Sequence, residues 1–368
     1  MRRSSGVLLV IGVLLLAAAA AVRFAAYPAI DQLPADFDRT VTYTGTGSFL
    51  NPSAIASGNA ANALLLNQDV TVERHVKVTS THGATAIVSD DITGTLANGT
   101  KVLSLNHTWA IDRKTMNEAQ APSGVQVDPH QGITIGFPID VSPQDHTYWD
   151  TNTQQAVPAK YQSTVTYNGR QALIFKVSAN GQVKDPKLLA QLPPGLPKTA
   201  LGSLTSLLPQ ALQSQLGALA PNLPATLPLG YTSANTITAW IDSKTGLPLN
   251  VQQQETVTAG LSLGGAALPL IPVLSFDIKN NQASINQAVN DAKNYSEGLS
   301  AVGTWVPIAL LVLGVLCLLA ALLLWRRKKP APAGPPDYPG PSGPAGPGGP
   351  ATPGDSTNPT GTSWGPES

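Results

Sequence analysis

Two long uncharged segments, one near each end of the chain, constrain the fold more than any other feature of this sequence. Residues 6–22 form a run of 17 without a charge, and residues 305–325 form a run of 21. At about 1.5 Å per residue, a 21-residue helix is roughly 31 Å long, which matches a hydrocarbon core of about 30 Å. Tryptophans stand at both ends of the second run, where interfacial aromatic side chains belong. We therefore expect 305–325 to form a transmembrane helix.

A cluster of basic residues follows this second run at once. Its members are Arg326, Arg327, Lys328 and Lys329. Positive charge gathered at one end of a span places that end in the cytoplasm. We interpret these four residues as topology determinants, which makes 326–368 cytoplasmic and puts the preceding part of the chain outside.

The first run allows two interpretations. Arg2 and Arg3 precede it and a tract of small residues closes it, as in a cleaved secretory signal. Its length of 17 residues and the charge of Arg23 directly after it favour an uncleaved anchor over 1–23. Either interpretation exports the middle of the chain. If the anchor is kept, the protein is a two-pass plasma membrane protein with both termini in the cytoplasm.

The C-terminal tail differs from the rest of the chain in composition. The 39 residues of 330–368 include 12 Pro and 9 Gly. Such a segment cannot bury enough apolar surface to offset the entropy of ordering, so we predict disorder. The tail is either a docking segment for a cytoplasmic partner or a solvated spacer.

The exterior part, 24–304, has the features of an antiparallel β domain. In 69–78, valines alternate with polar residues, and this period of two predicts a half-buried strand. Asn-Gly pairs at 98–99, 168–169 and 180–181 favour the tight turns that join antiparallel strands. We therefore predict a mainly β fold, with a large extracytoplasmic domain flanked by two transmembrane helices.

One short element occurs twice in this domain. The stretch Trp-Ala-Ile-Asp-Arg-Lys-Thr at 109–115 shares Trp, Ile-Asp and Lys-Thr with Trp-Ile-Asp-Ser-Lys-Thr-Gly at 240–246. In each copy the Asp can accept hydrogen bonds from backbone N–H groups two residues on, and Gly246 can adopt a positive φ. Two tight reversals are predicted. The repeat leaves open whether the domain consists of two similar β lobes.

Two other segments of the exterior domain are predicted to be helical. Residues 192–229 are rich in Leu and Pro, and six leucines follow a helical spacing that Pro209 interrupts. This insertion either contacts lipid or lines an apolar groove, or it caps the β core with short helices. Residues 281–304 repeat apolar positions at helical spacing and lead into the second span. The candidate contact residues for an apolar ligand or the membrane are Leu201, Leu204, Leu208, Leu212, Leu216 and Leu219.

We find no convincing catalytic, metal-binding or cofactor-binding motif in the sequence. The pattern Gly-Leu-Ser-Leu-Gly at 260–264 matches a hydrolase nucleophile elbow, but all five histidines precede Ser262, against the order of that fold. The sequence has no Cys pair and no His-Glu-x-x-His. Residues 23–304 carry 16 Lys and Arg against 19 Asp and Glu, so nucleic acid is a poor candidate partner. We predict a protein without enzymatic activity, cofactor or metal.

Four short motifs, at 109–115, 136–138 (Gly-Phe-Pro), 148–150 (Tyr-Trp-Asp) and 240–246, together with the two spans, resemble an actinobacterial membrane protein family known as porin PorA-like. The resemblance covers Met1 to about Trp325. It implies a cell-envelope protein, and since that family has no agreed activity it supplies no functional residues.

Three functional hypotheses follow. The first is an envelope protein that binds or hands on an apolar envelope component, either a lipid or a lipoglycan. Its basis is the Leu- and Pro-rich segment 192–229 in a poorly charged domain held close to the membrane. The second is a scaffold that recruits cytoplasmic partners through the proline-rich tail. The third is a porin-like channel component.

Overall fold

The computed structural model describes residues 3–51, 54, 59, 62–198, 210, 213–214, 224–263 and 266–326. The Pro- and Gly-rich tail and three of the four basic topology determinants, Arg327, Lys328 and Lys329, lie outside these residues. The six candidate leucines of the insertion also lie outside them: Leu201, Leu204, Leu208, Leu212, Leu216 and Leu219.

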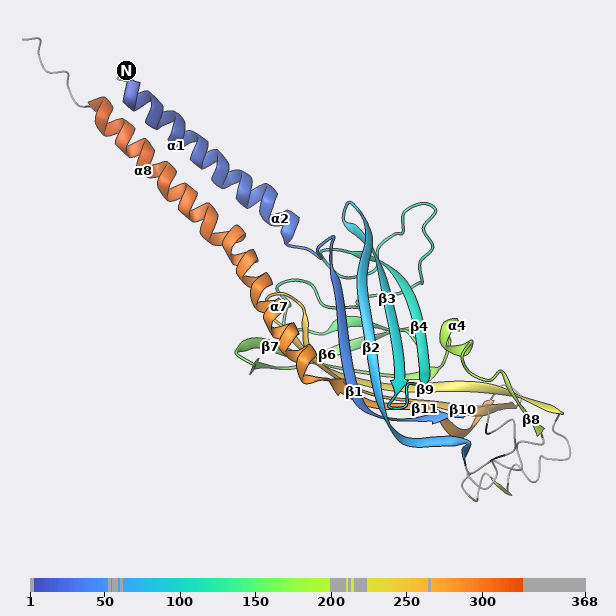
Figure 1. The fold of residues 1–368 in the computed structure, drawn as a ribbon. Helices are drawn as coiled ribbons and strands as arrows, with labels where there is room; N and C mark the ends of the chain where they lie inside the picture. Colours follow the sequence, from blue (N-terminus) through green and yellow to red (C-terminus); the bar gives the residue numbers. More distant parts are fainter. Residues whose placement is uncertain are drawn as a thin grey trace, which may run out of the picture.

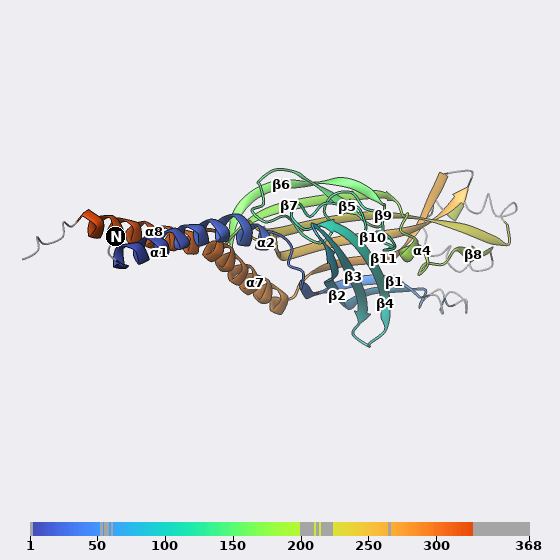
Figure 2. The ribbon, with the colours of Figure 1, turned by 90° about the horizontal axis from the view of Figure 1, so that it is seen from above.

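Two helices of the described chain, Ser4–Ile30 and Gln282–Arg326, are long and apolar enough to cross a membrane. The first consists of α1 (Arg3–Ala21), the π-helical turn η1 (Val22–Ala26) and α2 (Tyr27–Ile30). The second consists of α7 (Gln282–Ser300), the π-helical turn η4 (Ala301–Trp305) and α8 (Val306–Arg326). Figures 1 and 2 show α1 and α8 side by side, projecting away from the β domain. The predicted apolar helices at both ends are confirmed.

Glycines allow these two helices to approach closely. A β-carbon on Gly314 would lie 3.1 Å from the carbonyl oxygen of Gly12, and one on Gly12 would lie 2.8 Å from the side chain of Leu318. In a membrane, helix association depends on such close packing because lipid supplies no hydrophobic force between helices. The helix pair is therefore a packed hairpin rather than two independent anchors.

The described part of the β domain forms an antiparallel sheet of 11 strands, so the prediction of a mainly antiparallel β fold is confirmed. The strands are β1 (Asp38–Leu50), β2 (Leu64–His82), β3 (Thr85–Leu96), β4 (Lys101–Asp112), β5 (His146–Asp150), β6 (Gln155–Tyr167), β7 (Arg170–Gln182), β8 (Gly195–Pro197), β9 (Thr226–Asp242), β10 (Pro248–Leu263) and β11 (Ala266–Asn280). Their order is β4-β3-β2-β1-β11-β10-β9-β7-β6-β5, with β8 paired to β9. The sheet curls, so that β1–β4 cross the direction of β9–β11 (Figures 1 and 2). A short helix, α4 (Pro186–Leu189), precedes β8.

The alternating valines of β2 behave as predicted. Val70, Val72, Val76 and Val78 are all buried. They face the inside of the curled sheet, and Arg74 lies on the same face, whereas Thr71, Glu73 and Lys77 are exposed on the other face. Packing of this face against the opposite half of the sheet gives the domain its apolar core.

Two of the three predicted Asn-Gly turns are confirmed. Asn168 and Gly169 have φ values of 46° and 78° and join β6 to β7, and Gly99 has a φ of 84° between β3 and β4. The prediction at 180–181 is wrong, because Asn180 and Gly181 lie within β7, paired with Ala234 and Ser233 of β9. The pairing with β9 keeps this stretch extended, so the long-range partner overrides the local turn preference.

Both copies of the repeated element form the predicted turn. The carboxylate Oδ1 of Asp112 accepts from the backbone N of Thr115 at 2.7 Å, and that of Asp242 accepts from the backbone N of Thr245 at 2.9 Å. Four residues after each Asp, the chain has a positive φ, 61° at Met116 and 71° at Gly246. The two turns follow β4 and β9, in the two halves of one continuous sheet.

The pairing of β1 with β11 joins these two halves, and Gly45 is critical to it. A β-carbon on Gly45 would collide with the carbonyl oxygen of Asp277 on β11. We expect Gly45→Ala to lower the free energy of unfolding by about 1–3 kcal/mol, as overpacking does. Gly230→Ala is the matched control, since a β-carbon on Gly230 meets nothing within 4 Å. Urea unfolding of both variants checks this, and equal effects would contradict it.

Candidate functional site

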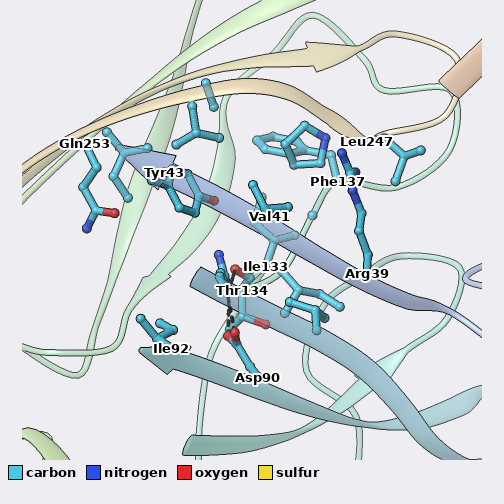
Figure 3. A pocket seen from close by; sticks show the side chains of 18 of the residues that line it. Arg39, Val41, Tyr43, Asp90, Ile92, Ile133, Thr134, Phe137, Leu247 and Gln253 are labelled. Carbon is cyan, nitrogen blue, oxygen red and sulfur yellow. Dashed lines mark hydrogen bonds and ion pairs between the residues drawn. The ribbon is translucent and has the colours of Figure 1, made fainter. Parts of the chain in front are cut away.

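The curled sheet encloses a cavity of about 540 Å³. Most of its lining comes from alternate residues of eight strands, so one face of the sheet forms much of the wall. On β1, Arg39, Val41 and Tyr43 line it at alternate positions, and Asp38 lines it at the start of the strand. Figure 3 shows the first three side chains pointing from β1 into the same space as Asp90 and Gln253. Pockets that hold small molecules have volumes of about 300–1,000 Å³, and this cavity falls within that range.

Most of the wall is apolar. Aliphatic side chains line it on both halves of the sheet, and Phe137 and Phe276 add aromatic surface. The aliphatic lining residues of the strands include Val41, Val72, Val76, Ile92, Leu103, Leu105, Ile237, Val251, Leu274 and Ile278. Such a surface binds hydrocarbon by excluding water from it.

A buried ion pair lies in this apolar wall. Arg74 donates from Nε to Oδ1 of Asp90 at 2.8 Å and from Nη2 to Oδ2 at 2.7 Å. The indole Nε1 of Trp109 donates to the same carboxylate at 3.2 Å, and Arg74 also donates to the backbone oxygen of Thr134 at 3.2 Å. Both charges are thus satisfied within the protein. This pair is a structural part of the wall.

Two carboxylates, Asp150 and Glu255, line another part of the cavity. Asp150 accepts hydrogen bonds from Asn235 Nδ2 at 3.0 Å and from the backbone N of Thr153 at 3.0 Å. Glu255 accepts from Asn152 and, at 3.1 Å, from Gln253 Nε2. Burial raises the pKa of Glu255 to about 7, and the charge of Asp150 adds to the increase. Near neutral pH, Glu255 is therefore partly protonated.

The raised pKa of Glu255 predicts how stability depends on pH. From its ordinary value of 4.5 up to about 7, the folded protein holds a proton that the unfolded chain has lost, so stability falls as pH rises through this window. This displacement corresponds to roughly 3 kcal/mol. We expect Glu255→Gln to raise the free energy of unfolding at pH 8 by up to that amount and to change it little at pH 4. Urea unfolding at both pH values measures this, with exposed Glu73→Gln as the control; equal gains at both would contradict it.

One end of the cavity lies next to the membrane helices. Gln287, Asp291 and Tyr295 of α7 line it, together with the segment 33–38 that connects α2 to β1. The hydroxyl of Tyr295 donates to the backbone oxygens of Ile30 and Gln32, each at 2.9 Å, which holds the two segments together. Tyr295 precedes Trp305 by 10 residues, or roughly 15 Å of helix. This end of the cavity is therefore the end next to the two apolar helices.

The cavity does not coincide with the residues selected from the sequence. The six leucines of the insertion lie outside the described residues, and Arg326, the described topology determinant, ends α8. Leu188, four residues before 192–229, is a lining residue. Sequence reasoning missed Arg39, Arg74 and Glu255. The available signal was a charged residue at an inward position of an alternating strand, as Arg74 is among the valines of β2.

We looked in the described part of the chain for a metal site and for the nucleophile elbow suggested by residues 260–264. Within it, no group of three or more His, Cys, Asp or Glu side chains could hold a metal ion. Ser262 lies in β10, an antiparallel strand, and not at the strand-to-helix turn of a nucleophile elbow.

Comparison with solved structures gives weak similarities. A MaoC domain protein described as a putative dehydratase, from Chloroflexus aurantiacus J-10-fl, is 14% identical over 73% of this chain and 80% of its own, with a TM-score of 0.13. A conserved hypothetical protein from Mycobacterium tuberculosis with a double hotdog fold is 12% identical over 72% of this chain and 80% of its own, with a TM-score of 0.14. TM-scores this low support no argument about this chain.

Family comparison is more informative. No curated protein matches the chain significantly. The family described as Porin PorA matches residues 4–323, which include nearly all of both apolar helices and the whole sheet. The resemblance seen in the short sequence motifs is thereby confirmed. The chain belongs to the porin PorA family and is a membrane protein of that family.

Proposed function

We propose that this membrane protein binds an amphiphilic envelope lipid in the cavity of its exterior domain and exchanges it with the adjacent membrane. The observation that carries the proposal is the position of the 540 Å³ cavity: its wall is largely aliphatic, and one end is formed by α7 and by residues 33–38. Both of these segments continue directly into membrane helices. A lipid leaving the bilayer thus has an apolar destination within roughly 15 Å of the membrane surface.

The proposal includes a topology. The β domain lies outside the plasma membrane, both helices span it, and both termini are cytoplasmic. The basic cluster that begins at Arg326 supports this topology, since such clusters stay on the cytoplasmic side. Protease added to intact cells should cut the β domain and leave a tag after Ser368 attached to the membrane fraction; a protected β domain would overturn this topology.

Filling the cavity should remove the bound lipid. Ala239 on β9 and Val41 on β1 line opposite halves of the sheet. We expect full-length Ala239→Trp and Val41→Phe proteins, purified in mild detergent, to retain at least about fivefold less lipid than the wild type, because the added rings occupy the space of several methylene groups. Lipid extraction and mass spectrometry provide the measurement.

Ala97→Trp is the matched control, since Ala97 is exposed in the turn between β3 and β4. It should retain lipid like the wild type. Circular dichroism and thermal melting identify any variant that fails to fold. Two substitutions of different size are used so that the test remains possible if the larger one prevents folding. A wild-type protein without lipid, or folded cavity variants that keep theirs, would rule out lipid binding in this cavity.

The family match favours a second candidate, a porin-like channel component. The full-length protein in planar bilayers tests it by single-channel conductance. Discrete conductance steps that disappear in the Ala239→Trp protein would assign the cavity to a pore rather than to a lipid site.

A further inference from the structure

One charged side chain in the cavity, that of Arg39, has buried nitrogen atoms that bond to none of the described residues. Arg39 is 9% exposed, and its Nε and Nη2 atoms are buried without a hydrogen-bond partner among the described residues. Figure 3 shows its side chain extending from β1 toward Phe137 and Leu247, two apolar members of the same wall. Arg74, by contrast, donates hydrogen bonds from Nε and Nη2 to the carboxylate of Asp90.

A buried guanidinium without partners is costly. Burial lowers the pKa of Arg39, while Asp291 and Tyr43 raise it through space. Arg nevertheless stays charged, because its ordinary pKa exceeds 12. Asp291 therefore acts on Arg39 only at a distance, since Nε and Nη2 of Arg39 make no hydrogen bond to a described side chain. An unpaired buried charge destabilises a fold, so the place of this cation in a largely apolar cavity wall points to a role in binding.

The position of Arg39 specifies the geometry of a ligand. Arg39 is the second residue of β1, next to the segment that leaves the membrane, so it lies at the membrane-side end of the cavity. Val41 and Tyr43 follow on the same face, and the aliphatic wall continues beyond them. Asp36 and Asp291 line the same end, and the guanidinium of Arg39 with the apolar wall behind it offers a contact for an anionic head and a surface for a hydrocarbon tail. A guanidinium binds carboxylate or phosphate oxygens through paired N–H groups.

We propose that Arg39 is the headgroup site for an anionic amphiphile, whose carboxylate or phosphate binds the guanidinium while its acyl chain lies along the aliphatic wall. This rests on the proposed function and narrows its ligand class from lipids in general to acidic ones. Neutral lipids can enter the same cavity, but they leave the charge of Arg39 unneutralised.

Photoreactive probes test the proposal on the full-length protein in lipid nanodiscs. The probes are a diazirine-bearing palmitic acid and its methyl ester, which have the same chain and differ in charge. Cross-linked peptides from β1, β2 and β9 report occupancy of the cavity. We expect the acid to label these peptides about tenfold more than the ester, which is the order of selectivity that one charge-assisted hydrogen bond supplies.

Variants of Arg39 test whether this residue causes the preference for the acid over the ester. Arg39→Met should abolish it, Arg39→Lys should restore part of it, and the control Lys101→Met, which removes an exposed cation on β4, should leave it unchanged. Because Arg39→Met removes an unpaired buried charge, it should also raise the thermal midpoint of the lipid-stripped protein. The acid should then raise the midpoint of the wild type only.

The outcomes separate this inference from the proposed function. Equal labelling by acid and ester, unaltered in Arg39→Met, overturns the anion site and leaves lipid binding in place. Labelling by neither probe overturns both. If inorganic phosphate at millimolar concentration raises the wild-type midpoint as much as the acid does, Arg39 binds a free anion and the amphiphile proposal fails.

Discussion

Asp242→Ala should lower the free energy of unfolding by about 3–5 kcal/mol, whereas Asp112→Ala should lower it by only about 1 kcal/mol. The two aspartates occupy the same position of the repeated turn and accept the same three hydrogen bonds. For Asp242 these come from Lys244 N, Thr245 N and Thr245 Oγ1 at 3.2, 2.9 and 2.8 Å. For Asp112 they come from Lys114 N, Thr115 N and Thr115 Oγ1 at 3.1, 2.7 and 2.9 Å.

The difference between the two sites is burial and a counterion. Asp242 is 1% exposed and also accepts from Arg170, at 2.6 Å from Nε and 3.1 Å from Nη2. Arg170 in turn donates to the hydroxyl of Ser296 on α7, so this pair connects the sheet to the helix that enters the membrane. Removing Asp242 leaves a largely buried guanidinium without its carboxylate, which is far more costly than losing the hydrogen bonds of a turn.

Urea unfolding of the full-length protein, followed by tryptophan fluorescence, measures both variants. Adding Arg170→Met to Asp242→Ala should recover part of the loss, because the unpaired cation is then gone. Equal losses for the two aspartate variants would show that the turn, rather than the buried ion pair, determines stability here.

The turns and strands were predictable because their determinants are local. In each copy of the repeat, the Asp and the residue with positive φ are four positions apart, within one reversal of the chain. The burial of the valines of β2 could be predicted from their alternating spacing alone. At 180–181 the same local logic failed, since pairing with β9, more than 50 residues away in sequence, decides the conformation of Asn180 and Gly181.

The cavity was beyond sequence reasoning for the opposite reason. Arg39 and Asp291 are 252 positions apart in sequence, and both line the same cavity only because β1 pairs with β11 and α7 follows β11. Whether an inward charge is paired also depends on the register between strands. Asp90 on β3 lies opposite Val76 of β2, and Arg74 is two residues before Val76 on the same face, so the two side chains are diagonal neighbours. Alternation alone could show that Arg74 faces inward, but not that Asp90 would neutralise it while Arg39 stays unpaired.

Arg74→Met should lower the free energy of unfolding by about 3–5 kcal/mol, because it leaves Asp90 as an uncompensated charge in the cavity wall. Burial alone would raise the pKa of Asp90, yet the adjacent Arg74 guanidinium holds it below its ordinary value of 3.8. The stabilisation by this pair is therefore complete at neutral pH and is lost as pH falls below about 4. Loss of Arg74 should remove this acid sensitivity as well as the stability.

A double-mutant cycle separates the pair from its surroundings. The combination Arg74→Met with Asp90→Leu should be markedly more stable than Arg74→Met alone, since well-packed apolar residues can replace a buried ion pair at little cost. The control is the exposed pair Lys244–Asp140, with side chains 68% and 57% exposed at 2.9 Å. For this exposed pair, Asp140→Asn should lower the free energy of unfolding by no more than about 1 kcal/mol. Additive effects of the two cavity substitutions would mean that Arg74 and Asp90 stabilise the wall independently, and the contrast with unpaired Arg39 would then lose its physical basis.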